Sequence, residues 1–169
     1  DGWYFIGESK YLEMLAIISL PGERARIDAL MEGIFQNKSI QRLILGTDDA
    51  LGDFIDPMTQ FIGNSNNLLG ISFVHMNIER QQAEDIVSML RQIQCNPMEE
   101  ISFLHSNISE EGLDEIYRFF RSQPQIELLD LKDTNIGRNV CVTLGSILSS
   151  WHAPKLEYLN LEDTSIDDR

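Results

Sequence analysis

One phrase of apolar residues recurs along this 169-residue chain at nearly constant spacing. Its clearest copy reads Leu156-x-x-Leu159-x-Leu161. The phrase starts at Leu12, Ile40, Leu68, Met98, Ile126 and Leu156, so successive starts are 28, 28, 30, 28 and 30 residues apart. A period of this length predicts an array of equivalent units, each of which buries its apolar face against its neighbours.

Each unit combines a short strand with a helix. Positions 4 and 6 of the phrase alternate as in a strand, and position 11 returns to the core after a turn. The residues that follow show the i, i+3, i+4, i+7 spacing of amphipathic helices. These stripes are Ile27, Leu30, Met31 and Ile34; Phe54, Met58, Phe61 and Ile62; Ala83, Ile86, Val87, Leu90 and Ile93; Leu113, Ile116, Tyr117 and Phe120; and Val140, Leu144, Ile147 and Leu148. Pro57 predicts a late start for the second helix, and Ser109 is placed as the N-cap of the fourth.

A strand and a helix about every 29 residues resembles the leucine-rich repeat family, specifically its longer ribonuclease-inhibitor-like subtype. The resemblance covers roughly residues 12–166. It departs at position 9, where Asn or Cys is usual and where this chain has Asp48, Met76, Ser106, Thr134 and Thr164. Thr and Ser can still hydrogen-bond to the backbone, whereas Met76 cannot donate. Gly112 matches a small-residue position of that subtype.

The resemblance implies an α/β leucine-rich repeat solenoid, a curved horseshoe segment with a parallel sheet on its concave face and helices on its convex face. We expect about six repeats of 28–30 residues, occupying residues 12–169. Residues 1–11 form an N-terminal flank or cap, in which the apolar run Trp3-Tyr4-Phe5-Ile6 covers the end of the array. Because the chain stops at Arg169, after a strand phrase and before a covering helix, we expect a truncated array.

The acidic charge of the chain limits its partners. It has 27 acidic and 13 basic side chains, a formal charge of −14. Phosphate backbones and anionic membranes are repelled by such a surface, which leaves another protein as the expected partner. The alternative is that the acidity only maintains solubility. The sequence gives no indication of oligomeric state.

The cysteines and the lack of targeting signals favour a cytoplasmic protein. Cys95 and Cys141 fit no disulfide or zinc pattern, and Cys141 falls in an apolar stripe as a buried free thiol. No transmembrane run or signal peptide is visible. Two glycosylation patterns, starting at Asn37 and Asn107, keep secretion as an alternative.

Positions 3, 5 and 7 of each strand are predicted to face outward on the concave side. They are apolar or small in the N-terminal strands, and acidic beside apolar residues in the C-terminal strands. Position 2 adds Glu99, Glu127 and Glu157 at the sheet edge. The predicted partner-binding residues are Glu100, Leu104, Leu128, Asp130, Lys132, Glu157, Tyr158, Asn160 and Glu162. Apolar anchors beside charges are typical of a protein-binding patch for a basic and apolar partner, and a merely solvated sheet face is the alternative.

Position 8 places a column of polar residues just beyond the strand ends. Its members are Thr47, His75, His105, Asp133 and Asp163. Two imidazoles followed by two carboxylates have the chemistry of a divalent metal site or of a pH-sensitive pair. The third interpretation is that these residues are only solvated, and we expect no metal and no cofactor.

The sequence favours a protein–protein interaction scaffold over an enzyme. It has no Gly-rich phosphate loop, GxSxG elbow, HExxH helix or Cys–His pair at a recognisable spacing. Two alternatives remain open: the ligand-sensing portion of a larger receptor, and a GTPase-activating or other enzyme-accessory repeat protein.

Overall fold

The computed structural model describes residues 6, 8–18, 24–46, 52–92, 98–122, 126–136, 142, 145 and 156–164. The main sheet consists of β1 (Met14–Ile18), β2 (Arg42–Gly46), β3 (Gly70–Val74), β5 (Glu100–Leu104), β7 (Leu128–Asp130) and β9 (Tyr158–Asn160). The helices in the described part are α2 (Arg24–Gln36), α3 (Gly52–Asn64), α4 (Arg80–Leu90) and α5 (Glu110–Ser122). The predicted α/β class is confirmed.

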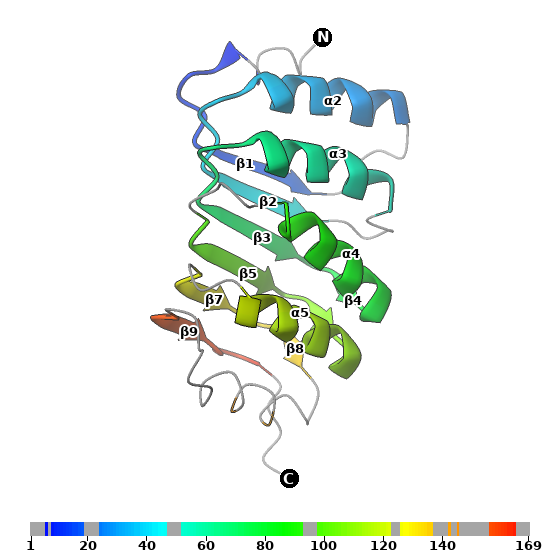
Figure 1. Ribbon diagram of the computed structural model, residues 1–169, viewed down its shortest axis with the longest axis vertical. Helices are drawn as coiled ribbons and strands as arrows, with labels where there is room; N and C mark the ends of the chain where they lie inside the picture. Colours follow the sequence, from blue (N-terminus) through cyan, green and yellow to red (C-terminus); the bar gives the residue numbers. More distant parts are fainter. Residues whose placement is uncertain are drawn as a thin grey trace.

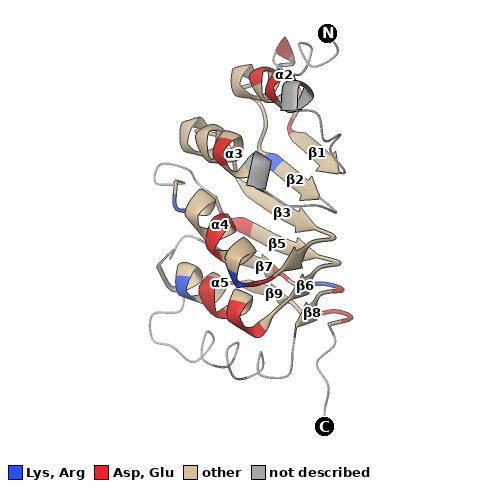
Figure 2. Cartoon of the chain, turned by 90° about the vertical axis from the view of Figure 1, so that its right-hand side faces the viewer, with Lys and Arg blue, Asp and Glu red and all other residues tan. Residues whose placement is uncertain are grey.

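All neighbouring strands of the main sheet pair in parallel, in the order β1-β2-β3-β5-β7-β9. Each strand pairs with its neighbour at the same position of the phrase, so Leu43 lies opposite Leu15 on one side and Ile71 on the other. A parallel neighbour requires a crossover, which α2, α3, α4 and α5 supply between the successive strands from β1 to β7. The helices lie side by side on one side of the sheet, and no described helix covers its other side (Figures 1 and 2).

A second, smaller sheet follows the turn after the main strands. Its members β4 (Asn77–Ile78), β6 (Asn107–Ile108) and β8 (Asn135–Ile136) pair in parallel. Their isoleucines occupy position 11 and are at most 2% exposed, which confirms the predicted return to the core. Next to them, the side-chain amide of Asn107 donates to that of Asn77 at 2.7 Å.

The core lies between the main sheet and the helices. Inward-facing residues of successive strands stack on one another, as the rings of Phe73 and Phe103 do with centroids 5.3 Å apart. The predicted helical stripes supply the opposite wall, and their buried members are Leu30, Met31, Ile34, Met58, Phe61, Ile62, Ala83, Ile86, Val87, Leu90, Leu113, Ile116 and Phe120. Several residues named in the sequence predictions lie outside the described part of the chain. They are the fifth stripe, Trp3–Phe5, Ile93, the two cysteines, Thr47 and Asp48, together with the side chains of Ile27 and Phe54.

The expected late start of the second helix is wrong. Helix α3 begins at Gly52, and Pro57 lies inside it. A proline in this place removes one backbone hydrogen bond near the helix start. Met58, Phe61 and Ile62 are at most 3% exposed, and we attribute the persistence of the helix to their packing.

Hydroxyl groups at position 9 bond to the backbone as predicted. Thr134 is fully buried and its Oγ1 donates to the carbonyl oxygen of Phe103. Ser106 Oγ donates to the Leu104 carbonyl oxygen at 3.0 Å and accepts from the backbone N–H of Met76 at 3.2 Å. In the unit with Met76 at position 9, the missing hydroxyl group is therefore supplied by Ser106 of the next unit, which accepts from the Met76 backbone.

Helix α5 starts with the predicted N-cap. Ser109 Oγ accepts a hydrogen bond from the backbone N–H of Gly112 at 3.1 Å. Glu110 and Glu111 follow in the first turn, where negative charge complements the helix dipole. Gly112 itself lies against β4, because a Cβ there would be 2.7 Å from the Ile78 carbonyl oxygen.

We expect Gly112→Ala to lower the free energy of unfolding by about 1–3 kcal/mol, since the added methyl group forces the helix away from backbone. Gly63→Ala in α3 is the matched control, because the nearest atom to its added Cβ is 3.6 Å away. That control should be neutral or stabilise by up to about 1 kcal/mol through helix propensity. Urea unfolding measures both, and equal effects of the two substitutions would contradict the close approach at Gly112.

Candidate functional site

The side of the main sheet opposite the helices carries the predicted partner-binding residues. Strand register places them in rows that cross β5, β7 and β9. One row contains Glu100, Leu128 and Tyr158, and the next contains Ser102, Asp130 and Asn160. The structure therefore brings residues from three distant segments of the chain into one surface, which we call the sheet-face patch.

The sheet-face patch exposes apolar groups. Tyr158 is 53% exposed, and Leu104 and Leu128 are half-buried. Glu157 is exposed directly before Tyr158. Position 2 also forms the predicted column, because the N–H of Glu127 donates to the carbonyl oxygen of Glu99 and that of Glu157 to Glu127, both at 2.8 Å.

In the N-terminal and central part of the same face, the outward-facing residues are less exposed to solvent than their position in the strands suggests. Met14 and Ile18 on β1 are more than half exposed. On the central strands, however, the outward-facing Val74 and Ser102 are 7% and 2% exposed. Gly70 is buried as well. The Glu100 side chain lies against Gly70, and Ser102 Oγ donates to Ser72 Oγ at 2.7 Å. The accessible apolar surface of this part lies mainly on β1 and on the half-buried Ile44.

An ion pair crosses the middle of the face. Arg42 Nε donates to Glu100 Oε2 at 3.3 Å, although the two residues lie on strands separated by β3. Gly70 lies between them in the register, and a Cβ there would be 3.2 Å from the Glu100 carboxylate. The absence of a side chain at this glycine therefore makes room for the bridge.

A second pair occupies the C-terminal part of the face. Lys132 Nζ bonds to Glu162 Oε2 at 2.8 Å, and this hydrogen bond raises the pKa of the lysine ammonium group. Asp130 Oδ1 accepts from the backbone N–H of Lys132 at 2.9 Å. Several charges predicted to attract a partner are thus already engaged within the chain, a property for which the strand pattern carries no signal.

The position-2 column holds the remaining acidic charge of the face. Within the described part of the chain, no ion pair involves Glu99, Glu127 or Glu157. Glu99 and Glu157 are exposed, and Glu127 is half-buried. These carboxylates lie on successive segments at the start of the strands, so their potentials add at one edge of the sheet-face patch.

The position-8 column has a backbone role. His75, His105, Asp133 and Asp163 all have φ between 51° and 56°. Histidine and aspartate are among the residues that adopt this left-handed conformation most readily after glycine. The need for a sharp turn at the end of each strand therefore accounts for the residue types in the column.

The side chains of this column also contact one another. The rings of His75 and His105 stack with centroids 5.0 Å apart, and His105 Nδ1 lies 3.2 Å from Asp133 Oδ2. Among the described residues, no group of three or more His, Cys, Asp or Glu side chains has the arrangement of a metal site. No described helix is long and apolar enough to cross a bilayer.

One of the two glycosylation patterns is engaged in the fold. Asn37 is 5% exposed, and its Nδ2 donates to the carbonyl oxygens of Ile6 and Ser9 at 2.5 and 2.9 Å. Its Oδ1 accepts from the backbone N–H of Ser39 at 2.7 Å. This side chain ties the segment before β1 to the turn after α2. Asn107, in the second pattern, is exposed.

Substitutions at His75 separate the backbone role of the column from its side-chain chemistry. We expect His75→Val to lower the free energy of unfolding by roughly 1–2 kcal/mol more than His75→Asn, since valine resists the left-handed conformation that asparagine tolerates. Both substitutions remove the stacked ring, so their difference reports the backbone. Chemical unfolding measures it, and equal stabilities of the two variants would contradict this interpretation.

A double-mutant cycle tests the bridge across Gly70. With Arg42→Ala and Glu100→Ala, we expect a coupling free energy of about 0.2–1 kcal/mol, because both side chains are partly exposed. The coupling should fall in about 1 M salt, where screening is strong. A value of zero at low salt would show that the two side chains do not pair in solution.

Comparisons with known proteins bear on the fold only. No protein-family model matches the chain, and no curated protein matches it by sequence. Among solved structures, a chain titled leiomodin-1 actin-binding site 2 has a similar architecture, with a TM-score of 0.63 over 90% of this chain and 86% of that chain. The two sequences are 8% identical, so the likeness shows a shared arrangement of parallel sheet and helices.

Proposed function

We propose that this chain is a leucine-rich repeat scaffold of the ribonuclease-inhibitor-like subtype, which binds another protein on the uncovered face of its sheet. The repeat assignment is supported by the phrase and by strands that pair at equivalent phrase positions. It is supported further by the position-9 hydroxyl groups that bond to the backbone and by the buried position-11 isoleucines.

The composition of the sheet-face patch carries the functional proposal. Tyr158 projects beside the half-buried Leu128, next to the glutamates of position 2. A tyrosine with an aliphatic neighbour and a charged rim is the usual composition of a protein-binding hot spot. The partner would present a basic rim around an apolar centre, and the net charge of −14 argues against nucleic acid.

The absence of recognised catalytic motifs supports a scaffold without enzymatic activity of its own. The ion pairs on the face are side-chain contacts within the chain, and none of them forms a recognised catalytic arrangement. Because the structural neighbour is titled as an actin-binding site, purified actin is one concrete protein to include in a binding test.

Charge reversal at Glu127 and Glu157 tests the sheet-face patch without breaking an internal ion pair. We expect Glu127→Lys with Glu157→Lys to slow association with a captured partner several-fold at low salt, and Tyr158→Ala to cost about 2 kcal/mol of affinity. Affinity capture from cell extract with quantitative mass spectrometry identifies the partner, and surface plasmon resonance gives the rates. Actin is assayed in parallel.

The matched control reverses two glutamates on the helix side, Glu79 and Glu111, which are both exposed. It changes the net charge by the same amount at a distance from the patch. Two outcomes would exclude the sheet-face patch as the binding surface. In one, the captured protein binds the double charge reversal, Tyr158→Ala and the control equally well. In the other, the control weakens its capture as much as the substitutions in the patch do.

A further inference from the structure

The helix side of the molecule has a groove between α2 and α3. Its volume is about 500 Å³. It is bounded on α2 by Asp28, Glu32 and Phe35 and on α3 by Asp56 and Pro57, with the buried Met31 also lining it. Helices α2 and α3 cover one side of the main sheet (Figure 2), so the groove between them lies on the opposite side from the sheet-face patch.

Two of the carboxylates along the groove, those of Glu32 and Asp56, have no basic partner among the described side chains. Glu32 and Asp56 are exposed, and no ion pair involves either of them among the side chains that the structure describes. Both face the groove, from opposite helices. The rim therefore carries negative charge on both sides of a partly apolar lining.

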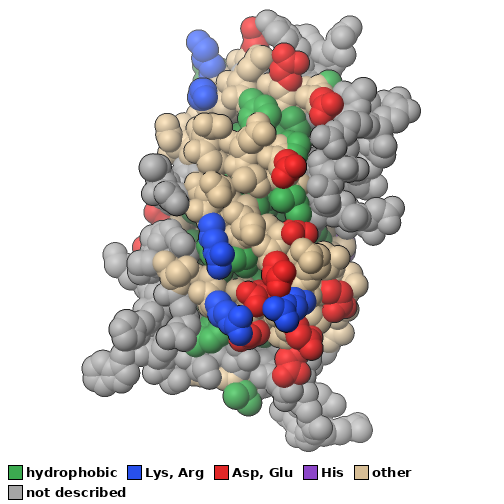
Figure 3. Space-filling model, turned by 45° about the vertical axis from the view of Figure 1, so that its right-hand side comes forward, with side chains coloured by type: hydrophobic (Ala, Val, Ile, Leu, Met, Phe, Trp, Pro, Cys, Tyr) green, Lys and Arg blue, Asp and Glu red, His purple; other side chains and the backbone are tan. Residues whose placement is uncertain are grey.

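The same side of the molecule is organised differently over α4 and α5. There Arg80 pairs with Glu84 at 2.8 Å, and Arg118 pairs with Asp114 at 2.6 Å and Glu115 at 2.9 Å. Figure 3 shows basic and acidic side chains interleaved over this lower part. Three ion pairs thus lie over α4 and α5, whereas none of the ion pairs among the described side chains involves Glu32 or Asp56.

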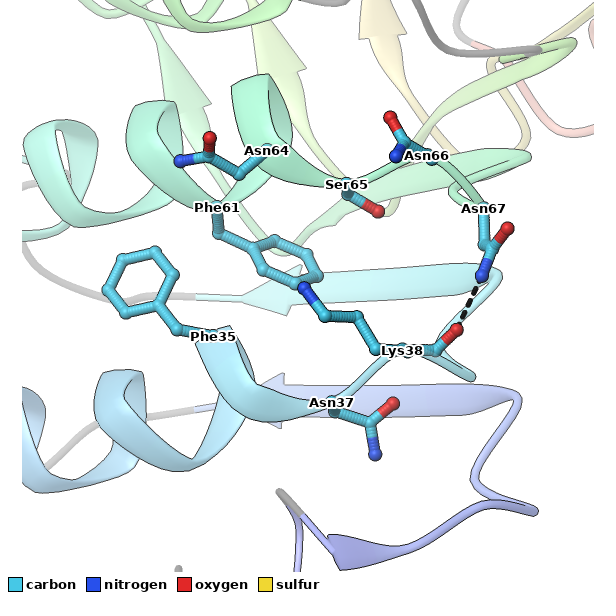
Figure 4. Close-up of a pocket in the computed structure, with 8 residues that line it drawn as sticks. All are labelled: Phe35, Asn37, Lys38, Phe61, Asn64, Ser65, Asn66 and Asn67. Atoms are coloured by element: carbon cyan, nitrogen blue, oxygen red, sulfur yellow. Dashed lines mark hydrogen bonds between the residues drawn. The ribbon is translucent and has the colours of Figure 1, made fainter.

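Phe35 gives the groove an aromatic anchor point. Its ring is half-buried and lies 6.4 Å from the ring of Phe61 in a tilted arrangement. The ring also borders a second cavity of about 240 Å³, which Lys38 and Asn64 help to line (Figure 4). Phe35 is therefore accessible from two cavities, while the phenylalanines at the equivalent end of α5, Phe119 and Phe120, are at most 2% exposed.

We propose that the α2–α3 groove docks a segment of a partner protein that presents a lysine or arginine beside an apolar side chain. The cation would lie between Glu32 and Asp56, and the apolar side chain would pack on Phe35 and Pro57. Charge complementarity selects this occupant, because an acidic segment would be repelled by both walls. An amphipathic helix laid in a groove is the common form of such recognition.

The test uses synthetic peptides of about 18 residues, which is long enough for an amphipathic helix in a groove. One peptide is built from leucine and lysine and the other from leucine and glutamate, with the same pattern. We expect the lysine peptide to bind by calorimetry and to shift the NMR signals of Phe35 and Gln60, and the glutamate peptide to give neither response.

Neutral substitutions locate the binding. Glu32→Gln with Asp56→Asn should weaken the lysine peptide roughly 5- to 10-fold, while Glu79→Gln with Glu111→Gln, with the same change of charge on the same side, should change affinity less than about twofold. Circular dichroism confirms that both variants fold. Equal weakening in the control, NMR shifts confined to other surfaces, or no binding of the lysine peptide would overturn the proposal.

Discussion

The lateral pairing of parallel strands is the interaction on which the other features depend. Each strand of the main sheet is short, and its inward residues are buried because the neighbouring strands place equivalent residues beside them and the helices cover them. The stacked rings of Phe73 and Phe103 are the clearest case, with Ile71 and Ile101 paired in the same strands. Because one unit cannot bury its own apolar face, the core forms only when the units lie side by side.

That constraint also determines the two outer surfaces. Register brings residues 30 positions apart into direct contact, as in the Ser72–Ser102 hydroxyl pair at 2.7 Å and the Lys132–Glu162 bridge at 2.8 Å. On the helix side, neighbouring helices are brought together in the same way, but their surface charges are compensated only over part of the face. This uneven distribution of ion pairs is the observation on which the proposed docking of a basic segment between α2 and α3 rests.

Much of the candidate site was predictable because strand geometry is periodic. Alternation identified the outward positions, and register confirmed that Glu100, Leu128 and Tyr158 share a row. The strand pattern contains no indication of a residue's environment where that environment depends on another unit. Val74 and Ser102 are buried although they face outward, and the bridge from Arg42 to Glu100 depends on the missing side chain of Gly70. Pro57 likewise lies inside a helix that its neighbours' packing supports.

The sequence by itself determined the order of strands and helices, the core positions and the direction in which each strand residue faces. These follow from spacing, because the pleat of a strand and the turn of a helix repeat with fixed periods. Only the tertiary structure decided which charges are compensated, which small residues are covered and why position 8 carries His and Asp. Those properties depend on distances between side chains of different units and on the left-handed backbone at each strand end, for which a linear pattern contains no direct signal.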